Sequence, residues 1–386
     1  MKTIISNVAV FREGTLTPAS IRVEAGKIKA VLPPNPAPED VQDADTILDG
    51  QRRLLIPGMI DVHIHGAHNR DMMDGTTTSI QAVSRACAET GCTGFLATSV
   101  SSSLDDLLAM IRSVKQVVGH EEGARIVGIH LEGPYLNVAR KGMQNPQHLR
   151  HPNLRELELI FREAEDLIKM VTIAPELPGG IELIHDLLRR NVVVAVAHSD
   201  ATYEEAQLAF REGATHITHC FNAMPSIHHR APGLVTAALE NDRVSVQAIV
   251  DGVHLHPGIV RLMHKIKGPD LMVLTTDALQ AMGVGDGDYV FGGHPVTVRE
   301  GIARLQDGTL ASSTVTMNRS LKLSVAFGIP LEDSIRMCSA TPASILQLNE
   351  TGRIEAGFDA DLVLLDDNFE VVETFIKGVP YRAALR

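Results

Sequence analysis

Two histidines stand one residue apart in the stretch PGMIDVHIHGAHNRDMMDG, which runs from Pro57 to Gly75. His63 and His65 close an apolar run that is typical of a β-strand. Because alternate residues of a strand face the same side, both imidazole rings can point at one metal ion. The spacing alone does not decide between a metal site and a pair of hydrogen-bonded structural histidines. A metal centre needs further ligands, and other segments of the chain have to supply them.

Ionisable residues also end several later apolar runs. Glu132 closes RIVGIHLEG, and a carboxylate behind so apolar a segment is costly to bury unless a metal or a basic side chain pairs with it. His198 and His219 close two further runs, and each one alone is more typical of a structural histidine. Together with Glu132 they form a histidine and carboxylate set that suits Zn²⁺ or Fe²⁺.

Asp277 closes the last of these runs, LMVLTTDAL. As a ligand or neighbour of a metal-bound water, it could take the proton of that water and pass it to a leaving group. It could also serve as the N-cap of a following helix. Asp251 and His254 follow the preceding run, and we interpret Asp251 as a cap or a supporting carboxylate.

The central part of the chain alternates short apolar runs with helical patterns such as SLDDLLAMIRSVKQVVG and TYEEAQLAFREG, whose apolar residues recur three or four apart. The eight apolar runs are LLIPGMIDVHIHG, TGFLATSVS, RIVGIHLEG, MVTIAPE, VVVAVAHSD, THITHCFNA, VSVQAIVDG and LMVLTTDAL. Continuous Val, Ile and Leu runs are typical of buried parallel strands. The pattern predicts an α/β fold, a (β/α)8 TIM barrel, in which the ends of the strands meet at one rim and bring the ionisable residues together. An open doubly wound sheet is the alternative, but no G-x-G-x-x-G turn follows the first strand.

Both ends of the chain are rich in β-strand patterns broken by Gly, Pro and Asp. We expect residues 1–56 and 346–386 to pair into a small β-sandwich domain, and residues 57–345 to form the catalytic barrel. This pairing is inferred from composition.

The formal net charge of −12 argues against nucleic acid or an anionic membrane surface as a partner. An anionic substrate would therefore need a local cluster of basic residues. No apolar run is long enough to cross a membrane, and the N-terminus lacks the pattern of a signal peptide. The four cysteines are widely spread without a C-x-x-C pair, so we expect a cytoplasmic protein.

Taken together, the motifs resemble the N-acetylglucosamine-6-phosphate deacetylases of the metal-dependent amidohydrolase superfamily. The resemblance spans nearly the whole chain and rests on PGMIDVHIHG, HLEGPYLNVARKGMQNPQHLR, THCFNAMPSIHHRAPGL, DGVHLHP and TTDAL. H-x-H alone would also suit dihydroorotases or hydantoinases, but those groups usually bridge two metals with a carbamylated lysine on the fourth strand. The run MVTIAPE has no lysine, so Glu132 is the bridging candidate.

The resemblance implies one or two divalent metal ions, Zn²⁺ or Fe²⁺, in each subunit. The implied metal ligands are His63, His65, Glu132, His198, His219 and Asp277. Glu132, His198 and His219 would hold the principal metal, and the two histidines of H-x-H would add a second. Asp277 would also be the catalytic residue, first as general base and then as the acid that protonates the departing amine.

The resemblance also implies a set of substrate contacts. These are Met143, Gln144, Asn222, Ala223, His229, Arg230 and His254. Arg230 would grip the phosphate of the substrate from the neighbouring subunit of a homodimer, whereas without the resemblance HHR would be an exposed polar loop. Gln144 stands where the family commonly has a histidine, and Ala231 where it commonly has a glutamate.

We therefore expect metal-dependent hydrolysis of the acetamide of N-acetylglucosamine 6-phosphate to glucosamine 6-phosphate and acetate, in amino-sugar catabolism. The two departures leave the sugar open, so N-acetylgalactosamine 6-phosphate is a close alternative, and another amide is a second. A barrel that binds a sugar phosphate as a sensor is the non-enzymatic alternative, against which the ligand set and Asp277 argue.

Overall fold

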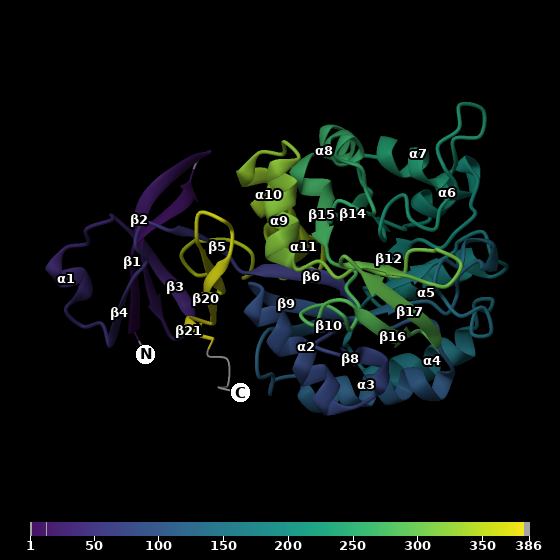
Figure 1. The fold of residues 1–386 in the computed structure, drawn as a ribbon, viewed down its shortest axis with the longest axis horizontal. Coiled ribbons are helices and arrows are strands. Elements are labelled where there is room, and N and C mark those ends of the chain that lie inside the picture. Colours follow the sequence, from purple (N-terminus) through teal and green to yellow (C-terminus); the bar gives the residue numbers. More distant parts are fainter. Residues whose placement is uncertain (1, 13, 382–386) are drawn as a thin grey trace.

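The computed structural model describes residues 2–12 and 14–381, and its chain forms a terminal β-sheet unit beside a barrel (Figure 1). Residues 1, 13 and 382–386, which fall in the expected terminal domain, lie outside the described residues. In Figure 1 the purple N-terminal strands and the yellow C-terminal strands lie together, so the two ends of the chain share one unit.

Eight parallel strands form the barrel in the order β15-β14-β13-β12-β11-β10-β9-β6. They are β6 (Met59–Ile64), β9 (Cys92–Thr98), β10 (Arg125–Glu132), β11 (Ile168–Ile173), β12 (Val193–Val196), β13 (His216–Ile217), β14 (Ser245–Ile249) and β15 (Met272–Thr275). A parallel bridge between Ile64 and Ala278 joins the first strand to the last, and the Asp277 amide donates to the His63 carbonyl at 2.8 Å. The barrel prediction is confirmed for all eight runs, and the doubly wound alternative is wrong because the strand order closes on itself.

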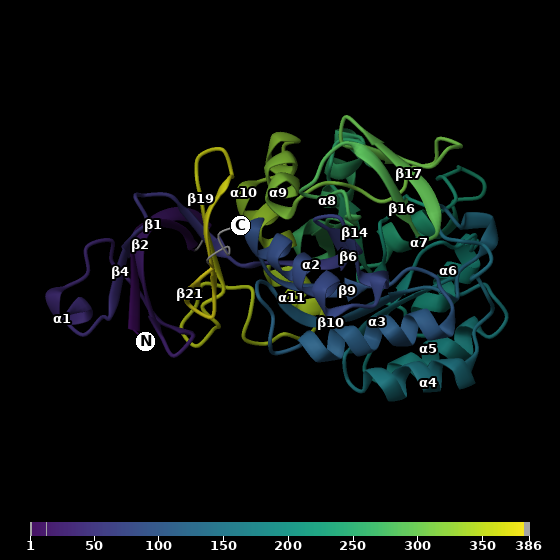
Figure 2. The ribbon, with the colours of Figure 1, turned by 60° about the horizontal axis from the view of Figure 1, so that its bottom comes forward.

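Helices cover the outside of the barrel, and Figure 2 shows α3, α4 and α5 below the barrel strands. The helices are α2 (Thr77–Glu89), α3 (Leu104–Val117), α4 (Leu154–Ala164), α5 (Gly180–Arg189), α6 (Tyr203–Arg211), α7 (Gly233–Glu240), α8 (Pro257–Leu271), α9 (Met317–Ala326), α10 (Leu331–Cys338) and α11 (Ala340–Ile345). Side-chain caps fix several starts: Ser103 accepts from the Asp106 amide, and Thr202 with Glu205 forms a capping box. α8 comprises two helical pieces, because Gly268 between them has a φ of 63°.

The terminal unit is one mixed sheet built from both ends of the chain. Its elements are β1 (Lys2–Arg12), β2 (Thr15–Glu24), β3 (Lys27–Leu32), α1 (Pro38–Val41), β4 (Thr46–Asp49), β5 (Leu54–Pro57), β19 (Leu362–Leu365), β20 (Val371–Ile376) and β21 (Val379–Pro380). β5 pairs antiparallel with β19, which confirms that the ends associate. The sheet folds over a core that includes Val8, Ile21 and Phe375.

A short antiparallel sheet, which the sequence prediction missed, lies between β15 and α9. It comprises β16 (Gly287–Phe291), β17 (His294–Arg299) and β18 (Ile302–Arg304). The smaller elements β7 (Gly66–Ala67), β8 (Arg70–Asp71) and η1 (Met72–Asp74) follow β6, and η2 (Val138–Arg140) follows β10. Phe291, Val296 and Val298 pack with Met143 in one apolar cluster. The sheet therefore sits against the segment that follows β10, close to the barrel rim.

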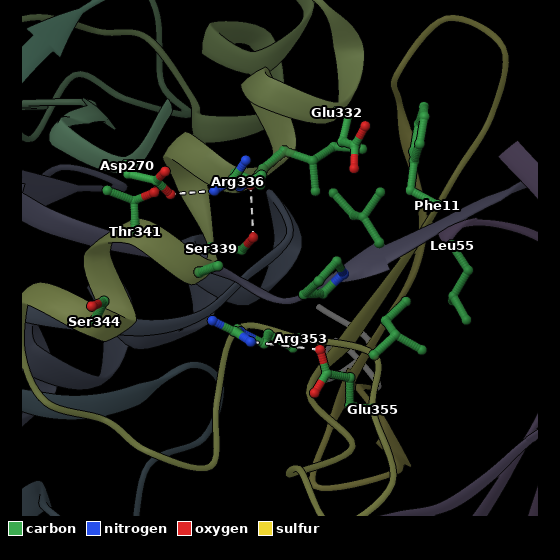
Figure 3. A pocket seen from close by; sticks show the side chains of 16 residues that line it. Phe11, Leu55, Asp270, Glu332, Arg336, Ser339, Thr341, Ser344, Arg353 and Glu355 are labelled. Carbon is green, nitrogen blue, oxygen red and sulfur yellow. Dashed lines mark hydrogen bonds and ion pairs between the residues drawn. The ribbon is translucent and has the colours of Figure 1, made fainter. Parts of the chain in front are cut away.

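The largest cavity, about 520 Å³, lies where the terminal sheet meets α10 and α11 (Figure 3). Its charged residues include Arg336, which pairs with Asp270, and Arg353, whose NH1 lies 3.6 Å from Glu355 Oε1. We call this space the interdomain cavity. Among residues 2–12 and 14–381, no helix combines the length and apolar character that a membrane span needs.

Candidate active site

The ionisable residues predicted from the strand ends converge at the C-terminal rim of the barrel. They form two groups, within each of which the candidate ligand atoms lie within 4.8 Å of one another, and none of the six residues is more than 7% exposed. The groups are His63, His65 and Asp277, and Glu132, His198 and His219. Burial of so many ionisable groups is costly in free energy unless a counter-ion compensates them.

Glu132 lies between the two groups. Its Oε1 is 3.1 Å from His219 Nε2, 3.4 Å from His198 Nε2 and 3.5 Å from His63 Nε2. Asp277 Oδ1 is 3.2 Å from His65 Nε2. The carboxylate of Glu132 is therefore placed to touch cations in both groups.

The imidazole nitrogens face one another at the centre of the site. His63 Nε2 lies 3.0 Å from His65 Nε2, and His198 Nε2 lies 3.1 Å from His219 Nε2. Two nitrogens at this distance repel each other if both present a lone pair with no cation between them. They also repel each other if both carry a proton. Divalent cations that take imidazole and carboxylate ligands, such as Zn²⁺ and Fe²⁺, fit this donor set.

Hydrogen bonds on the far side of two rings orient their metal-facing nitrogens. His63 Nδ1 lies 3.0 Å from Gln247 Oε1, and His198 Nδ1 lies 2.9 Å from the Arg140 carbonyl. Both acceptors require a proton on Nδ1, which leaves Nε2 free to bind a metal. Gln247 was not predicted as a site residue, although a lone amide within the apolar run VSVQAIV is a usable signal.

His130 lies beside the two groups without belonging to either, and both of its ring nitrogens have hydrogen-bond partners. Its Nδ1 lies 3.1 Å from the Val62 carbonyl and its Nε2 lies 2.7 Å from Thr172 Oγ1. Burial holds the pKa of His130 well below its usual value, so the ring is neutral.

The two carboxylates stay ionised although they are buried. Burial raises the pKa of Glu132, but His63 and the hydrogen bonds of His198 and His219 outweigh it and hold that pKa well below its usual value. Burial likewise raises the pKa of Asp277, but His63 and His65 lower it to about 2. Both carboxylates are therefore ionised at neutral pH, beside histidines that stabilise their charge.

Asp277 follows β15 in a left-handed backbone conformation, with φ 48°. The next element of the chain is the strand β16, so the alternative that Asp277 caps a following helix is wrong. Asp61 on β6 holds the end of β15 in place. Its carboxylate accepts hydrogen bonds from the Thr275 hydroxyl at 2.8 Å and from the Thr276 hydroxyl at 2.5 Å. These bonds tie β6 to β15 and so fix H-x-H relative to Asp277.

A cavity of about 200 Å³ opens beside the two groups, and we call it the rim cavity. Of the predicted substrate contacts, five line it: Met143, Gln144, Asn222, Ala223 and His254. Gln144 spans the cavity wall, because its Oε1 accepts from the Ser101 amide at 2.8 Å and its Nε2 donates to Glu132 Oε2 at 2.6 Å. It thus holds Glu132 as well as facing the cavity.

His254 is fixed by its neighbour Asp251. The His254 ring Nδ1 lies 2.7 Å from Asp251 Oδ2, and Asp251 Oδ1 accepts from the Val253 and His254 amides at 2.8 Å each. Burial raises the pKa of Asp251, but the His254 contacts and these amides lower it below its usual value. The supporting role predicted for Asp251 is confirmed.

His229 and Arg230 do not line the rim cavity of their own chain. They lie on the exposed loop between β13 and α7, where Arg230 NH1 is 2.6 Å from His229 Nε2. Among the described residues that line the cavity, none is a lysine or an arginine.

Four further residues line the cavity without having been predicted: Gly142, Thr309, Leu310 and Ser312. Gly142 has a φ of 56°, and an added Cβ would lie 3.2 Å from His198 Cε1, so glycine is needed beside that ligand. The other three lie after β18, in the segment between β15 and α9 whose strands the sequence prediction missed.

The chain is similar in sequence to a known protein family and to proteins of named activity. The model of the amidohydrolase family matches residues 54–380. The chain is 34% identical to the N-acetylglucosamine-6-phosphate deacetylase of Bacillus subtilis, over 97% of this chain and 96% of that protein. It is 32% identical to the N-acetylgalactosamine-6-phosphate deacetylase of Escherichia coli O157:H7, with 95% of each covered.

Solved structures agree over the full fold. The N-acetylglucosamine-6-phosphate deacetylase of Pasteurella multocida superposes with a TM-score of 0.91 at 30% identity, covering 98% of this chain and 99% of that one. A variant of the Mycobacterium smegmatis deacetylase, solved in complex with N-acetyl-D-glucosamine-6-phosphate, gives a TM-score of 0.90 at 33% identity, covering 99% and 100%.

Proposed function

This chain belongs to the amidohydrolase family, and we propose that it hydrolyses the acetamide of N-acetylglucosamine 6-phosphate to glucosamine 6-phosphate and acetate, a step of amino-sugar catabolism. The observation that carries the proposal is the pair of buried candidate ligand groups at the rim cavity, one of which contains Asp277, with Glu132 placed between them. The deacetylase names of the full-length relatives support the substrate.

The family is metal-dependent, and we propose that His63, His65, Glu132, His198, His219 and Asp277 hold one or two Zn²⁺ or Fe²⁺ ions. A divalent cation in this site supplies Lewis acidity, which activates water and polarises a carbonyl. The presence of both groups favours two ions, because each offers three ligands from separate strand ends.

In the proposed mechanism, Asp277 moves the proton. Its carboxylate, whose pKa is lowered to about 2, accepts the proton of the attacking water and returns it to the nitrogen of the departing amine. Gln144 keeps Glu132 in place through the 2.6 Å hydrogen bond. His254, Asn222 and Ala223 contact the sugar from the cavity wall.

We propose that the active unit is a homodimer in which Arg230 reaches the phosphate in the neighbouring rim cavity. The exposed position of this arginine supports the idea, as does the lack of Lys and Arg among the described residues lining the cavity of its own chain. A phosphate needs cationic donors, and the guanidinium fork suits it.

A complementation assay tests this arrangement. Neither Arg230→Ala nor Asp277→Asn chains should turn over efficiently alone. After co-refolding or co-expression in equal amounts, about a quarter of the sites should pair an intact Asp277 with an intact Arg230 and regain activity. No recovery in verified mixed dimers would contradict the contribution from the partner subunit.

Acetate release by the metal-loaded protein tests the activity itself. We expect turnover of N-acetylglucosamine 6-phosphate with kcat/KM at least about 100-fold above that for unphosphorylated N-acetylglucosamine, because charged phosphate contacts are lost in the latter. N-acetylgalactosamine 6-phosphate belongs in the same assay, since one relative is named for that epimer. Binding without turnover of any N-acetyl sugar phosphate would favour a sensor, and turnover of unphosphorylated amides alone would favour another amidohydrolase activity.

We further propose that residues 1–56 and 346–386 form the terminal domain and residues 57–345 the barrel domain, a division that the β5–β19 pairing supports. A cytoplasmic location is proposed as well. The four cysteines support it, because all are buried thiols without a disulfide.

A further inference from the structure

Ser312 has a backbone conformation that serines rarely adopt. It lies on the segment after β18 with φ 58°, in the left-handed region where a Cβ costs free energy that glycine avoids. The residue is 7% exposed and lines the rim cavity. Strain kept at a cavity wall suggests that the side chain does something there that glycine cannot.

The hydroxyl of Ser312 contacts the carboxylate proposed to move the proton. Ser312 Oγ donates to Asp277 Oδ1 at 3.1 Å. His65 Nε2 is 3.2 Å from the same oxygen and His63 Nε2 is 3.5 Å from it. These contacts all fall on Oδ1, so Oδ2 is left for exchange of a proton with a ligand in the cavity.

The backbone around Ser312 is held by its neighbour, without help from the Ser312 hydroxyl. The Ser313 amide donates to the Asp277 carbonyl at 2.8 Å, and the Ser313 hydroxyl donates to the Thr276 carbonyl at 2.6 Å. The Leu279 amide in turn donates to the Ser313 carbonyl at 3.0 Å. The hydroxyl of Ser312 is therefore not needed to fix the loop, and its contact is with Asp277.

We propose that Ser312 is a positioning residue that fixes the orientation of the Asp277 carboxylate, with Oδ1 turned toward the histidines and Oδ2 toward the scissile amide. This inference rests on the proposed role of Asp277 as the proton carrier. The hydroxyl acts through Asp277, so its loss slows proton transfer without weakening the contacts that bind the sugar phosphate.

Two substitutions separate the hydroxyl from the strain. Ser312→Ala removes the hydroxyl and keeps a Cβ in the left-handed region, whereas Ser312→Gly removes both. We expect both variants to lose about ten- to hundredfold in kcat, the effect of one hydrogen bond to a charged group, with KM within about twofold of the parent. Metal content should be unchanged, and Ser312→Gly should raise the thermal midpoint by about 1–2 °C because it relieves the strain.

Gln347→Gly is the matched control. Gln347 also has a left-handed backbone, with φ 57°, but it is exposed and does not line the rim cavity. This variant should gain thermal stability to a similar extent and keep the parent kcat. Full kcat in both Ser312 variants would overturn the proposal, and so would a rise in KM at constant kcat, because that pattern belongs to direct substrate contact.

A structural readout keeps the test independent of turnover. Crystal structures of the metal-loaded parent and of Ser312→Ala should show the Asp277 carboxylate in one orientation in the parent and rotated or in two orientations in the variant. An unchanged single orientation would contradict the positioning role. Failure of the parent to release acetate would instead count against the proposed function, while the two structures would still decide the role of Ser312.

Discussion

The interdomain cavity and the rim cavity differ in size and in chemistry, and the smaller of the two is the candidate active site. The interdomain cavity is about 520 Å³ and the rim cavity about 200 Å³. In the larger one, Arg336 faces Asp270 and Arg353 faces Glu355 (Figure 3), on side chains that are 42–74% exposed. Opposite charges there neutralise each other in water, so they leave little unsatisfied charge to act on a ligand.

In the rim cavity the ionisable side chains are buried, and carboxylates and imidazoles converge on one another in two candidate metal-binding groups. Glu132 and Asp277 remain ionised because histidines surround them, and the histidine nitrogens face one another at about 3 Å. Convergent buried ionisable groups with perturbed pKa values mark a functional site better than volume does. This contrast predicts large functional effects at the rim and small ones in the interdomain cavity.

The largest effect should come from Asp277→Asn. The amide keeps the size of the carboxylate but cannot accept the proton, so kcat should fall about 10³-fold. Acetate release under saturating substrate measures the change, with metal content determined alongside it. Arg353→Ala, in the interdomain cavity, is the control and should keep kcat within about twofold. A near-normal kcat in Asp277→Asn would remove Asp277 from the mechanism.

Metal removal should come next in size. A chelator should reduce acetate release reversibly and lower the thermal midpoint, since a ligand bound only to the folded state stabilises it by about 4 kcal/mol at a thousand times its Kd. The double variant His63→Ala with His65→Ala keeps Glu132, His198 and His219, so metal analysis should find one ion per chain in place of two. An unchanged stoichiometry would place the second ion elsewhere.

The barrel and its ligands are predictable from sequence for a physical reason. Each buried parallel strand reads as a continuous apolar run, and each candidate ligand lies at or just after the end of a run, so the closure of the barrel brings these residues together. Even β13, which has only two residues, was found because His219 closes its run. By contrast, His229 and Arg230 were assigned from resemblance, because nothing in an exposed HHR loop indicates a phosphate.

The insertion after β15 shows what the sequence analysis missed. In β17, buried and exposed residues alternate, and Gly292 and Gly293 form the turn before it, so a hairpin signal was present. The role of Ser312 had no comparable signal, because it depends on a left-handed φ and on the register that pins the loop beside Asp277. Tertiary contacts alone determine the left-handed φ of Ser312 and the position of its loop beside Asp277.

A third prediction concerns a buried ion pair between the two domains, as distinct from the exposed pairs of the interdomain cavity. Arg125 on β10 pairs with Asp361, which is 1% exposed. Arg125→Met should lower the unfolding free energy by about 3 kcal/mol, because it leaves a buried carboxylate without its cation. Denaturant unfolding at pH 7 measures this, and kcat should not change.

The same variant has a pH dependence with a defined sign. Burial raises the pKa of Asp361 above its usual value, whereas Arg125 lowers it. Loss of Arg125 therefore raises the pKa of Asp361 further. A carboxyl whose pKa is raised in the folded state contributes stability to the protein at low pH, and this contribution is lost as the pH rises through the folded-state pKa. The difference between parent and variant should be large at pH 7 and shrink as the pH falls, because protonation of the folded carboxyl removes the charge that Arg125 stabilises. A difference that grows on acidification would contradict this assignment.

The smallest effect should come from the interdomain cavity itself. Arg336→Ala combined with Arg353→Ala removes both exposed cations, each of which is at least 42% exposed and paired with a solvated carboxylate. Because exposed pairs contribute about 0–1 kcal/mol, the unfolding free energy should change by no more than about 1 kcal/mol, and kcat and KM should stay within about twofold. Raising the salt concentration should shrink even this difference, since surface charges are screened. A tenfold loss of kcat or of apparent affinity would mean that the larger cavity is coupled to the reaction, and the contrast between the two cavities would no longer hold.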